Sequence, residues 1–311
     1  MTPVNKRTRF QTSALIAATV GATLLAGISP AIAAPLNLPK APLFLNSAVD
    51  PNLVVTLDDS GSMTEASMPD SIIGNYCQPR WYYSGYNRLY YNPNIRYTPP
   101  LRSDGTPFPD SNFSAAWRDG YEGQPAATVT FAGGTSTVNL GTRYFPTRSY
   151  NTRAGAATGT QVGYAATCTG GNWTLPFASG TGTGTVATRF SSAFYYTYDG
   201  TTYTPVDVTT QSAAEQTNFA NWYSYYRTRA LMARTALTRV FGVQDQNMRV
   251  AWQNLWAKQL AVGTDPVVPF TGAGRNAFFQ WLYRSPASGA TPNRAAMLRV
   301  ARMFQSGSPA L

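Results

Sequence analysis

The stretch LVVTLDDSGSM, residues 53–63, decides the fold of this 311-residue chain. Its first five residues, Leu53 to Leu57, form a short, mostly apolar run, which favours a strand buried on both faces, as in a parallel sheet. A loop follows at once, and open α/β sheets place their ligands at the carboxyl ends of the strands. We therefore predict an α/β fold with a ligand-binding loop at Asp58–Met63.

The loop contains oxygen-bearing side chains at alternate positions, Asp58, Ser60 and Ser62, and Gly61 permits a tight turn between them. Alternate side chains of extended backbone point to the same side. Carboxylate and hydroxyl oxygens are the ligands that hard divalent cations such as Mg²⁺, Mn²⁺ and Ca²⁺ prefer. The spacing alone is common by chance, but its position directly after an apolar strand supports a divalent-cation site.

The N-terminus is typical of a secretory signal peptide. Residues 1–10 contain three basic side chains and no acid, residues 14–28 are small or apolar and uncharged, and Ala31–Ala33 ends the segment with small residues. The apolar run is shorter than the roughly 20 residues that a bilayer-spanning helix needs. We predict cleavage after residue 33, with membrane contact only before cleavage; an uncleaved signal anchor is the alternative.

Composition excludes several classes of function. The chain has no histidine, which removes Ser-His and Cys-His catalysis and His-ligated zinc. A hydrolase using Asp58 or Asp59 is the remaining enzyme alternative, but adjacent residues of an extended strand point apart and make a poor carboxylate pair. The net charge of +10 comes from scattered arginines, not from a basic cluster. We expect neither an enzyme nor a nucleic-acid-binding protein.

The two cysteines, Cys77 and Cys168, belong to a chain that is expected to enter an oxidising compartment. A disulfide between them is the favoured interpretation. In the chain-entropy model, closing a loop of this length adds on the order of 4 kcal/mol to the free energy of unfolding.

The middle of the chain, residues 64–214, is rich in Gly, Thr, Ser, Tyr and Pro and has no helical periodicity. We predict a β-rich insertion there. Strand-like runs at residues 127–131 and 194–198, the second followed by the turn dipeptide Asp199-Gly200, predict hairpins.

Helical periodicity returns at Glu215, and Gly242 is predicted to end that helix in a left-handed C′ conformation. Its apolar positions are expected in the core and its arginines on a solvated flank. The arginines are Arg227, Arg229, Arg234 and Arg239; the apolar residues are Phe219, Trp222, Tyr223, Tyr226, Ala230, Ala233, Leu237 and Val240.

Further elements complete the predicted order of strand, insertion, helix, strand, helix, loop and helix. A second strand is predicted at 249–253 and a short helix at 273–284. A final helix is expected from Asn293, with Ala296, Met297, Val300, Ala301 and Phe304 on its apolar stripe.

The segment TLDDSGSM after an apolar strand resembles the metal-ion-dependent adhesion site of von Willebrand factor A domains. The resemblance implies a doubly wound, Rossmann-like parallel sheet with the cation at its carboxyl edge. It also implies a threonine ligand from a second loop, which Thr291 matches after Gly289. The alternative is that Thr291 is only a helix N-cap with Pro292 at N1, although one residue can do both.

Three further segments resemble the N-terminal region of PilY-type proteins of type IV pilus assembly and tip adhesion. They are YNRLYYNPNIRYTP (86–99), FANWYSYYRTRALMARTAL (219–237) and WLYRSPASGATPNRAA (281–296). The resemblance implies an exported protein in the periplasm, on the outer membrane surface or at a pilus tip. Its implied partners are minor pilins, or host or surface ligands, with an acidic group that completes the coordination of the cation.

The sequence also departs from these families. Von Willebrand A domains supply a further metal-site aspartate from a later loop, but no aspartate follows Asp265. PilY-type proteins continue into a large β-propeller, which this sequence lacks. We therefore expect either the N-terminal piece of a truncated protein or a short form with a weaker site.

The expected organisation is a signal peptide, an extended leader and one von Willebrand A-like domain with a short tail. The ranges are 1–33, 34–50, 51–305 (core 51–63 and 215–305, insertion 64–214) and 306–311. A structural or carbohydrate-binding surface protein, acting through the Tyr-rich insertion without metal, is the alternative function.

Overall fold

The computed structural model describes residues 50–121, 137–151, 160–163, 175–177, 190–256, 267–285, 287 and 289–305. The expected signal peptide, almost all of the leader, the strand-like run at 127–131, Cys168 and the tail lie outside the described residues. Within those residues, no helix combines the length and the apolar character that crossing a membrane requires.

A small sheet forms around the stretch that opens the domain. Strand β1 (Asn52–Leu57) pairs in parallel with β8 (Arg249–Asn254), from Asn52 opposite Arg249 to Leu57 opposite Asn254. Strand β9 (Val268–Pro269) pairs antiparallel with the other edge of β8. Both predicted strands and the α/β class are confirmed, while β9 makes the sheet mixed. The prediction that the first strand is buried on both faces was wrong, because Leu53 is exposed at this edge of the sheet. The wider doubly wound sheet stays a prediction.

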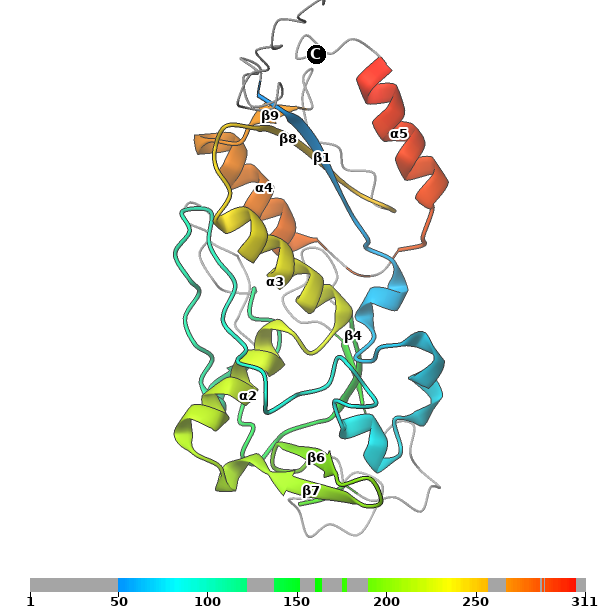
Figure 1. The fold of residues 1–311 in the computed structure, drawn as a ribbon, viewed down its shortest axis with the longest axis vertical. Coiled ribbons are helices and arrows are strands. Elements are labelled where there is room, and N and C mark those ends of the chain that lie inside the picture. Colours follow the sequence, from blue (N-terminus) through cyan, green and yellow to red (C-terminus); the bar gives the residue numbers. More distant parts are fainter. Residues whose placement is uncertain are drawn as a thin grey trace, which may run out of the picture. The chain divides into compact units, whose positions relative to one another are not determined.

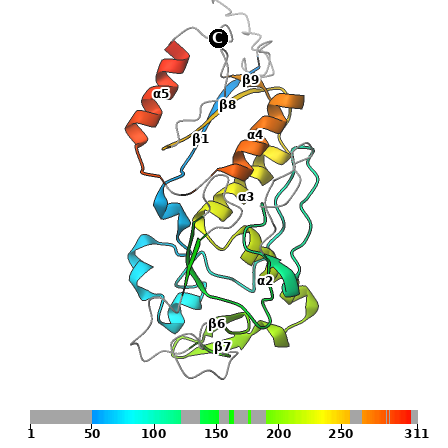
Figure 2. The ribbon, with the colours of Figure 1, turned by 180° about the vertical axis from the view of Figure 1, so that it is seen from behind.

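Helices cover the two faces of this sheet (Figures 1 and 2), with α3 (Arg229–Gly242) and α4 (Gly272–Arg284) on one face and α5 (Asn293–Gln305) on the other. Alternation along β8 explains the arrangement. Val250 and Trp252 belong to the core cluster that contains the aromatic side chains of α4. Ala251, between them, packs in a separate cluster with Met303 of α5.

The predicted long helix is in fact two helices, α2 (Ala213–Tyr225) and α3. Each begins at a hydroxyl N-cap: Ser212 accepts a hydrogen bond from the amide of Glu215, and Thr228 from that of Leu231. The single-helix prediction was wrong because the apolar spacing continues across the break, whereas the cap at Thr228 starts a new helix.

The C-terminus of α3 also differs from the prediction. Gly242 is the last helical residue, and it is not among the described glycines with positive φ. Its small size matters instead, because a Cβ there would lie 2.7 Å from the Cβ of Leu101. The guanidinium of Arg275 caps the helix by donating to the carbonyls of Phe241 and Gly242, both at 2.9 Å.

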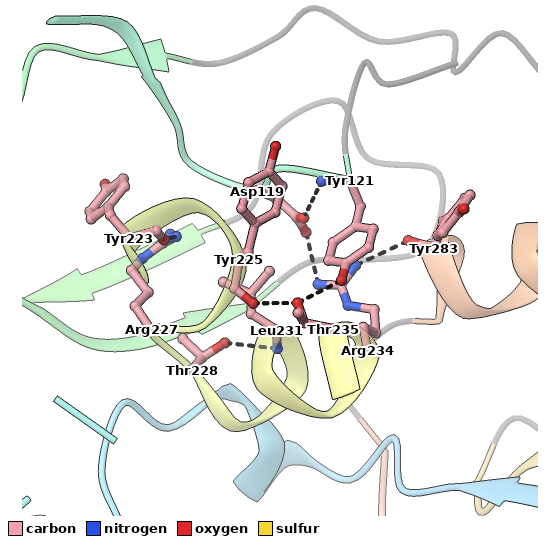
Figure 3. A network of polar contacts seen from close by, with 10 residues as sticks. All are labelled: Asp119, Tyr121, Tyr223, Tyr225, Arg227, Thr228, Leu231, Arg234, Thr235 and Tyr283. Atoms are coloured by element: carbon pink, nitrogen blue, oxygen red, sulfur yellow. Dashed lines mark hydrogen bonds and ion pairs between the residues drawn. The ribbon is translucent and has the colours of Figure 1, made fainter. Parts of the chain in front are cut away.

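Two of the arginines expected in solvent are buried. Arg234 forms an ion pair with Asp119 and donates to the carbonyl of Tyr283, in the network that Figure 3 shows. Arg227 is 1% exposed, and its guanidinium carbon lies 4.6 Å from the ring centroid of Tyr150. The solvated-flank prediction was therefore wrong for these two. Of the predicted apolar stripe, Val240 is exposed.

The described part of the insertion contains short antiparallel pairs and 3₁₀ turns. The predicted hairpin at Asp199-Gly200 is confirmed, with Gly200 at φ 103°. The pairs are β2 (Ala116–Trp117) with β3 (Thr137–Val138), β4 (Thr147–Asn151) with β5 (Thr160–Gly163), and β6 (Phe194–Tyr198) with β7 (Tyr203–Asp207). The 3₁₀ helices are η2 (Gly61–Thr64), η3 (Asp70–Asn75), η4 (Pro79–Tyr82), η5 (Phe113–Ala115) and η7 (Val208–Thr210).

The Tyr-rich segment forms a second aromatic core. Its rings pack on α2: the ring of Tyr91 lies 4.8 Å from that of Phe219, and the ring of Tyr90 lies 5.0 Å from that of Trp222. The segment, residues 76–97, belongs to the insertion that was predicted to be β-rich. It is built instead from 3₁₀ helices and turns, and it packs on α2 and the β6–β7 hairpin.

The apolar stripe predicted for α5 is only partly correct. Ala296 is buried, but Met297 and Phe304 are exposed, and Met303 provides the second buried contact. Residues 296 and 303 are two turns apart and lie on one face. The helix therefore packs on the sheet through a narrow seam.

Candidate functional site

The candidate cation loop directly follows β1 and is shaped by its own side chains. The amide of Ser60 donates to Asp58 Oδ1 at 2.8 Å, and the hydroxyl of Thr64 donates to the carbonyl of Gly61 at 2.7 Å. Such side-chain-to-backbone bonds two or three residues apart are how aspartate and threonine stabilise tight turns. The loop therefore has a defined conformation at the carboxyl end of the strand.

Two of the predicted ligands lie next to each other. The hydroxyls of Ser60 and Ser62 are hydrogen-bonded to each other, with their oxygens 3.0 Å apart; Ser60 is buried and Ser62 is exposed. In an octahedral magnesium shell with bonds of about 2.0–2.1 Å, neighbouring ligand oxygens are about 3 Å apart. The carboxylate of the half-buried Asp58 retains acceptor capacity beyond its bond to the Ser60 amide. This donor set fits a hard divalent cation.

A second loop, leading into α5, is bonded alongside the first. The amide of Gly61 donates to the carbonyl of Gly289, and the amide of Gly289 donates to the carbonyl of Asp59, both at 2.8 Å. Ser60 and Gly289 thus form a parallel bridge. Thr291 follows Gly289 by two residues, so its Cα lies within about 8 Å of that of Gly289. The segment that contains Thr291 therefore lies beside the Asp58–Met63 loop.

Thr291 does not occupy the N-cap position of α5, which was its alternative role; that position is one residue later in the chain. Helix α5 begins at Asn293, and the carbonyl of Pro292 accepts from the amide of Ala296 at 3.0 Å. The residue flanking the helix is therefore Pro292, and Thr291 is exposed outside it. The prediction of Thr291 at N-cap with Pro292 at N1 was wrong by one position.

Asp59 has a different environment from Asp58. Its side chain is 1% exposed, and its Oδ1 accepts a hydrogen bond of 2.7 Å from the amide of Trp256, directly after β8. Trp256 is 53% exposed, and its side chain packs against the backbone of Gly289, where a Cβ would come within 2.3 Å of the Trp256 Cβ. Sequence reasoning did not identify Trp256. The only feature of the sequence that pointed to its close contact was the glycine at position 289.

One arginine fastens α5 to the same end of the sheet. Arg299 donates through Nε to Gln253 Oε1 at 2.8 Å and through Nη2 to the carbonyls of Asn254 and Leu255. The side-chain amide of Gln253 donates in turn to the carbonyl of Ala296. The loop before α5 is thereby held at both of its ends, by Gly289 and by the first turns of the helix.

No group of three or more His, Cys, Asp or Glu side chains is placed to hold a metal within the part of the chain that the structure describes. The donor set at this loop is one carboxylate, Asp58, with hydroxyls. Cys77 is disulfide-bonded and packs against the aromatic core of the insertion. Its expected partner, Cys168, lies outside the described residues.

Comparison with known proteins finds relatives along nearly the whole chain. It is 33% identical over 318 residues to the type IV pilus biogenesis factor PilY1 of Pseudomonas aeruginosa strain PAK, covering 94% of this chain. It is also 33% identical over 329 residues to PilY1 of strain UCBPP-PA14, covering 99%. The matches cover 24% and 25% of those relatives. No family model and no solved structure matches the chain. The chain is therefore a homologue of PilY1 over most of its length, and it spans about a quarter of the length of these relatives.

Proposed function

We propose that this chain is an exported component of the type IV pilus system that binds partners through a divalent cation. Asp58, Ser60, Ser62 and Thr291 hold the cation, which is Mg²⁺, Mn²⁺ or Ca²⁺. The observation that carries the proposal is the Ser60–Ser62 oxygen separation of 3.0 Å, because it matches neighbouring ligands of one ion. Homology to PilY1 supports the pilus context and export to the periplasm, the outer membrane surface or a pilus tip.

The mechanism follows from the charge of the donor set. Asp58 contributes one negative charge, and the three hydroxyls contribute none, so the bound divalent ion keeps a net positive charge. Ser62 and Thr291 are exposed, which leaves the ion accessible from solvent. A divalent ion held by these residues would offer a positively charged binding point to a carboxylate on a minor pilin or on a host or surface ligand. The role is binding, not catalysis.

The test is a calorimetric titration of the purified chain with MgCl₂, MnCl₂ and CaCl₂. The native chain is expected to bind one cation saturably, and Asp58→Ala to lose binding while keeping a cooperative thermal melt. Asp245→Ala is the charge-matched control, because Asp245 is exposed and accepts hydrogen bonds from the next two residues. Native-like binding by Asp58→Ala would reject the site.

A second candidate function rests on the β6–β7 hairpin. The rings of Tyr198 and Tyr203 stack at 4.4 Å, and Tyr198 is exposed. Stacked tyrosines on a surface suit the apolar face of a sugar ring, which would make this a metal-independent carbohydrate-binding surface. Most of the other aromatic rings of the insertion are buried in its core, which favours the cation site. Chelation with EDTA distinguishes the two functions, since it abolishes adhesion only if the cation carries it.

A further inference from the structure

Asp59 uses two of its oxygens to join three separate segments of the chain. Its carbonyl accepts from the amide of Gly289, in the loop before α5, at 2.8 Å. Its carboxylate accepts from the amide of Trp256, directly after β8, at 2.7 Å. Asp59 itself follows β1, so the ends of both parallel strands and the second loop meet at this one residue.

The three segments that meet at Asp59 are all in contact with one another. Gly289 bonds back to the first loop by accepting from the amide of Gly61, and its backbone lies against the side chain of Trp256. Trp256 is bonded to Asp59, so each of the three segments contacts the other two. A change at Asp59 therefore alters the distance between the two loops, and with it the distance from Ser60 and Ser62 to Thr291.

We infer that Asp59 is a positioning residue of the cation site: its buried carboxylate holds the Trp256 amide and thereby fixes the Gly289–Thr291 loop against the Ser60–Ser62 loop. The inference rests on the proposed function and adds the residue that sets the geometry of the site. Residues that orient metal ligands from behind change metal affinity by roughly 10- to 100-fold when they are removed.

The bond to the Trp256 amide needs one acceptor oxygen, which an asparagine side chain also has. Asp59→Asn is therefore expected to keep the bond to the Trp256 amide and most of the affinity for cation, and Asp59→Ala to lose the bond. Titration of the purified chain with MnCl₂ should show Asp59→Ala roughly 10- to 100-fold weaker than native, with a cooperative melt retained. Asp58→Ala, lacking a ligand, should show no binding.

Three results would overturn the positioning role. Loss of binding in Asp59→Asn to the same extent as in Asp58→Ala would make Asp59 a direct ligand. Native affinity in Asp59→Ala would make it irrelevant to the site. If Asp59→Ala does not fold, Asp59→Asn decides, because retained affinity supports positioning and lost affinity refutes it.

Amide hydrogen exchange tests the positioning without any metal. In Asp59→Ala the Trp256 amide should exchange at least about tenfold faster, since it loses its buried acceptor. The neighbouring amide of Leu255, which donates to the carbonyl of Leu57, is the internal control and should keep its rate. If the native chain binds no cation, the proposed function fails, and an unchanged Trp256 rate would then refute the structural part of the inference as well.

Discussion

Arg234 and Asp119 form an ion pair of 2.9 Å whose side chains are 4% and 1% exposed. Around it, the Asp119 carboxylate accepts from the amide of Tyr121, and Arg234 donates to the carbonyl of Tyr283. The guanidinium also lies over the ring of Tyr121, with its carbon 4.7 Å from the ring centroid. The pair thus links the insertion to α3 and α4 (Figure 3), and the hydrogen bonds to the Tyr121 amide and the Tyr283 carbonyl offset part of the cost of burying two charges.

Asp119→Ala is predicted to be strongly destabilising. The substitution leaves the charge of Arg234 buried without its counter-ion, which costs about 3–5 kcal/mol. The free energy of unfolding, measured by urea denaturation, should fall by that amount. Asp245→Ala, which removes an exposed carboxylate, should change it by less than about 0.5 kcal/mol.

A second variant separates charge burial from general damage. Asp119→Ala combined with Arg234→Met removes both charges and keeps an apolar side chain of similar length. The double variant should be more stable than Asp119→Ala alone, because no uncompensated charge remains. If the double variant is no more stable than the single one, the charge argument is wrong.

Gly289→Ala is predicted to disturb the candidate cation site directly. A Cβ at this position would lie 2.3 Å from the Cβ of Trp256, an atom fixed to the backbone, so the two segments must move apart. Overpacking of this kind costs about 1–3 kcal/mol and should weaken cation binding as well. Gly74→Ala is the matched control, since a Cβ there meets nothing within 4 Å. Equal stability of the two variants would contradict the close approach of Trp256 to Gly289.

Local sequence patterns predicted those elements that are determined by residues close together in the chain. The run before Asp58 gave a strand, and the strand beginning at Arg249 pairs with it in parallel. The turn at Gly200 forms where the dipeptide required left-handed backbone. In the candidate site, the carboxylate and hydroxyl side chains and their place after β1 were visible for the same reason.

Contacts between distant residues account for what the sequence did not show. Arg234 and Asp119 are 115 positions apart, so nothing local distinguished this arginine from a solvated one. The Trp256 amide and the Asp59 carboxylate are 197 positions apart, and the bond exists only because the ends of β1 and β8 meet. The division into α2 and α3 was detectable in principle, through the hydroxyl cap at Thr228.

Stability should fall steeply in alkaline solution. Burial raises the pKa of Tyr97 to about 12 and moves those of Tyr121 and Tyr144 upward as well. An unfolded tyrosine loses its proton near pH 10, so above that value the unfolded chain releases protons that the folded chain retains. The free energy of unfolding is therefore expected to be flat from pH 7 to about pH 9 and to decrease above about pH 10. A series of urea titrations across this range measures it; a constant value up to pH 11 would contradict the burial of these hydroxyls.

Replacing Arg275 is predicted to release the C-terminus of α3. Its guanidinium donates to the last carbonyls of that helix and to the carbonyl of Ser103, so one planar group satisfies several buried acceptors. Arg275→Lys keeps the charge, but a compact ammonium cannot reproduce this fork of donors. Arg275→Ala leaves the acceptors unpaired, and each unpaired acceptor lowers the free energy of unfolding by about 1–3 kcal/mol. Thermal melting should therefore rank native above Arg275→Lys and Arg275→Lys above Arg275→Ala. Arg239→Ala, on the exposed side of the same helix, should melt close to native. Equal melting temperatures for Arg275→Lys and the native chain would show that charge alone, acting on the helix dipole, is sufficient.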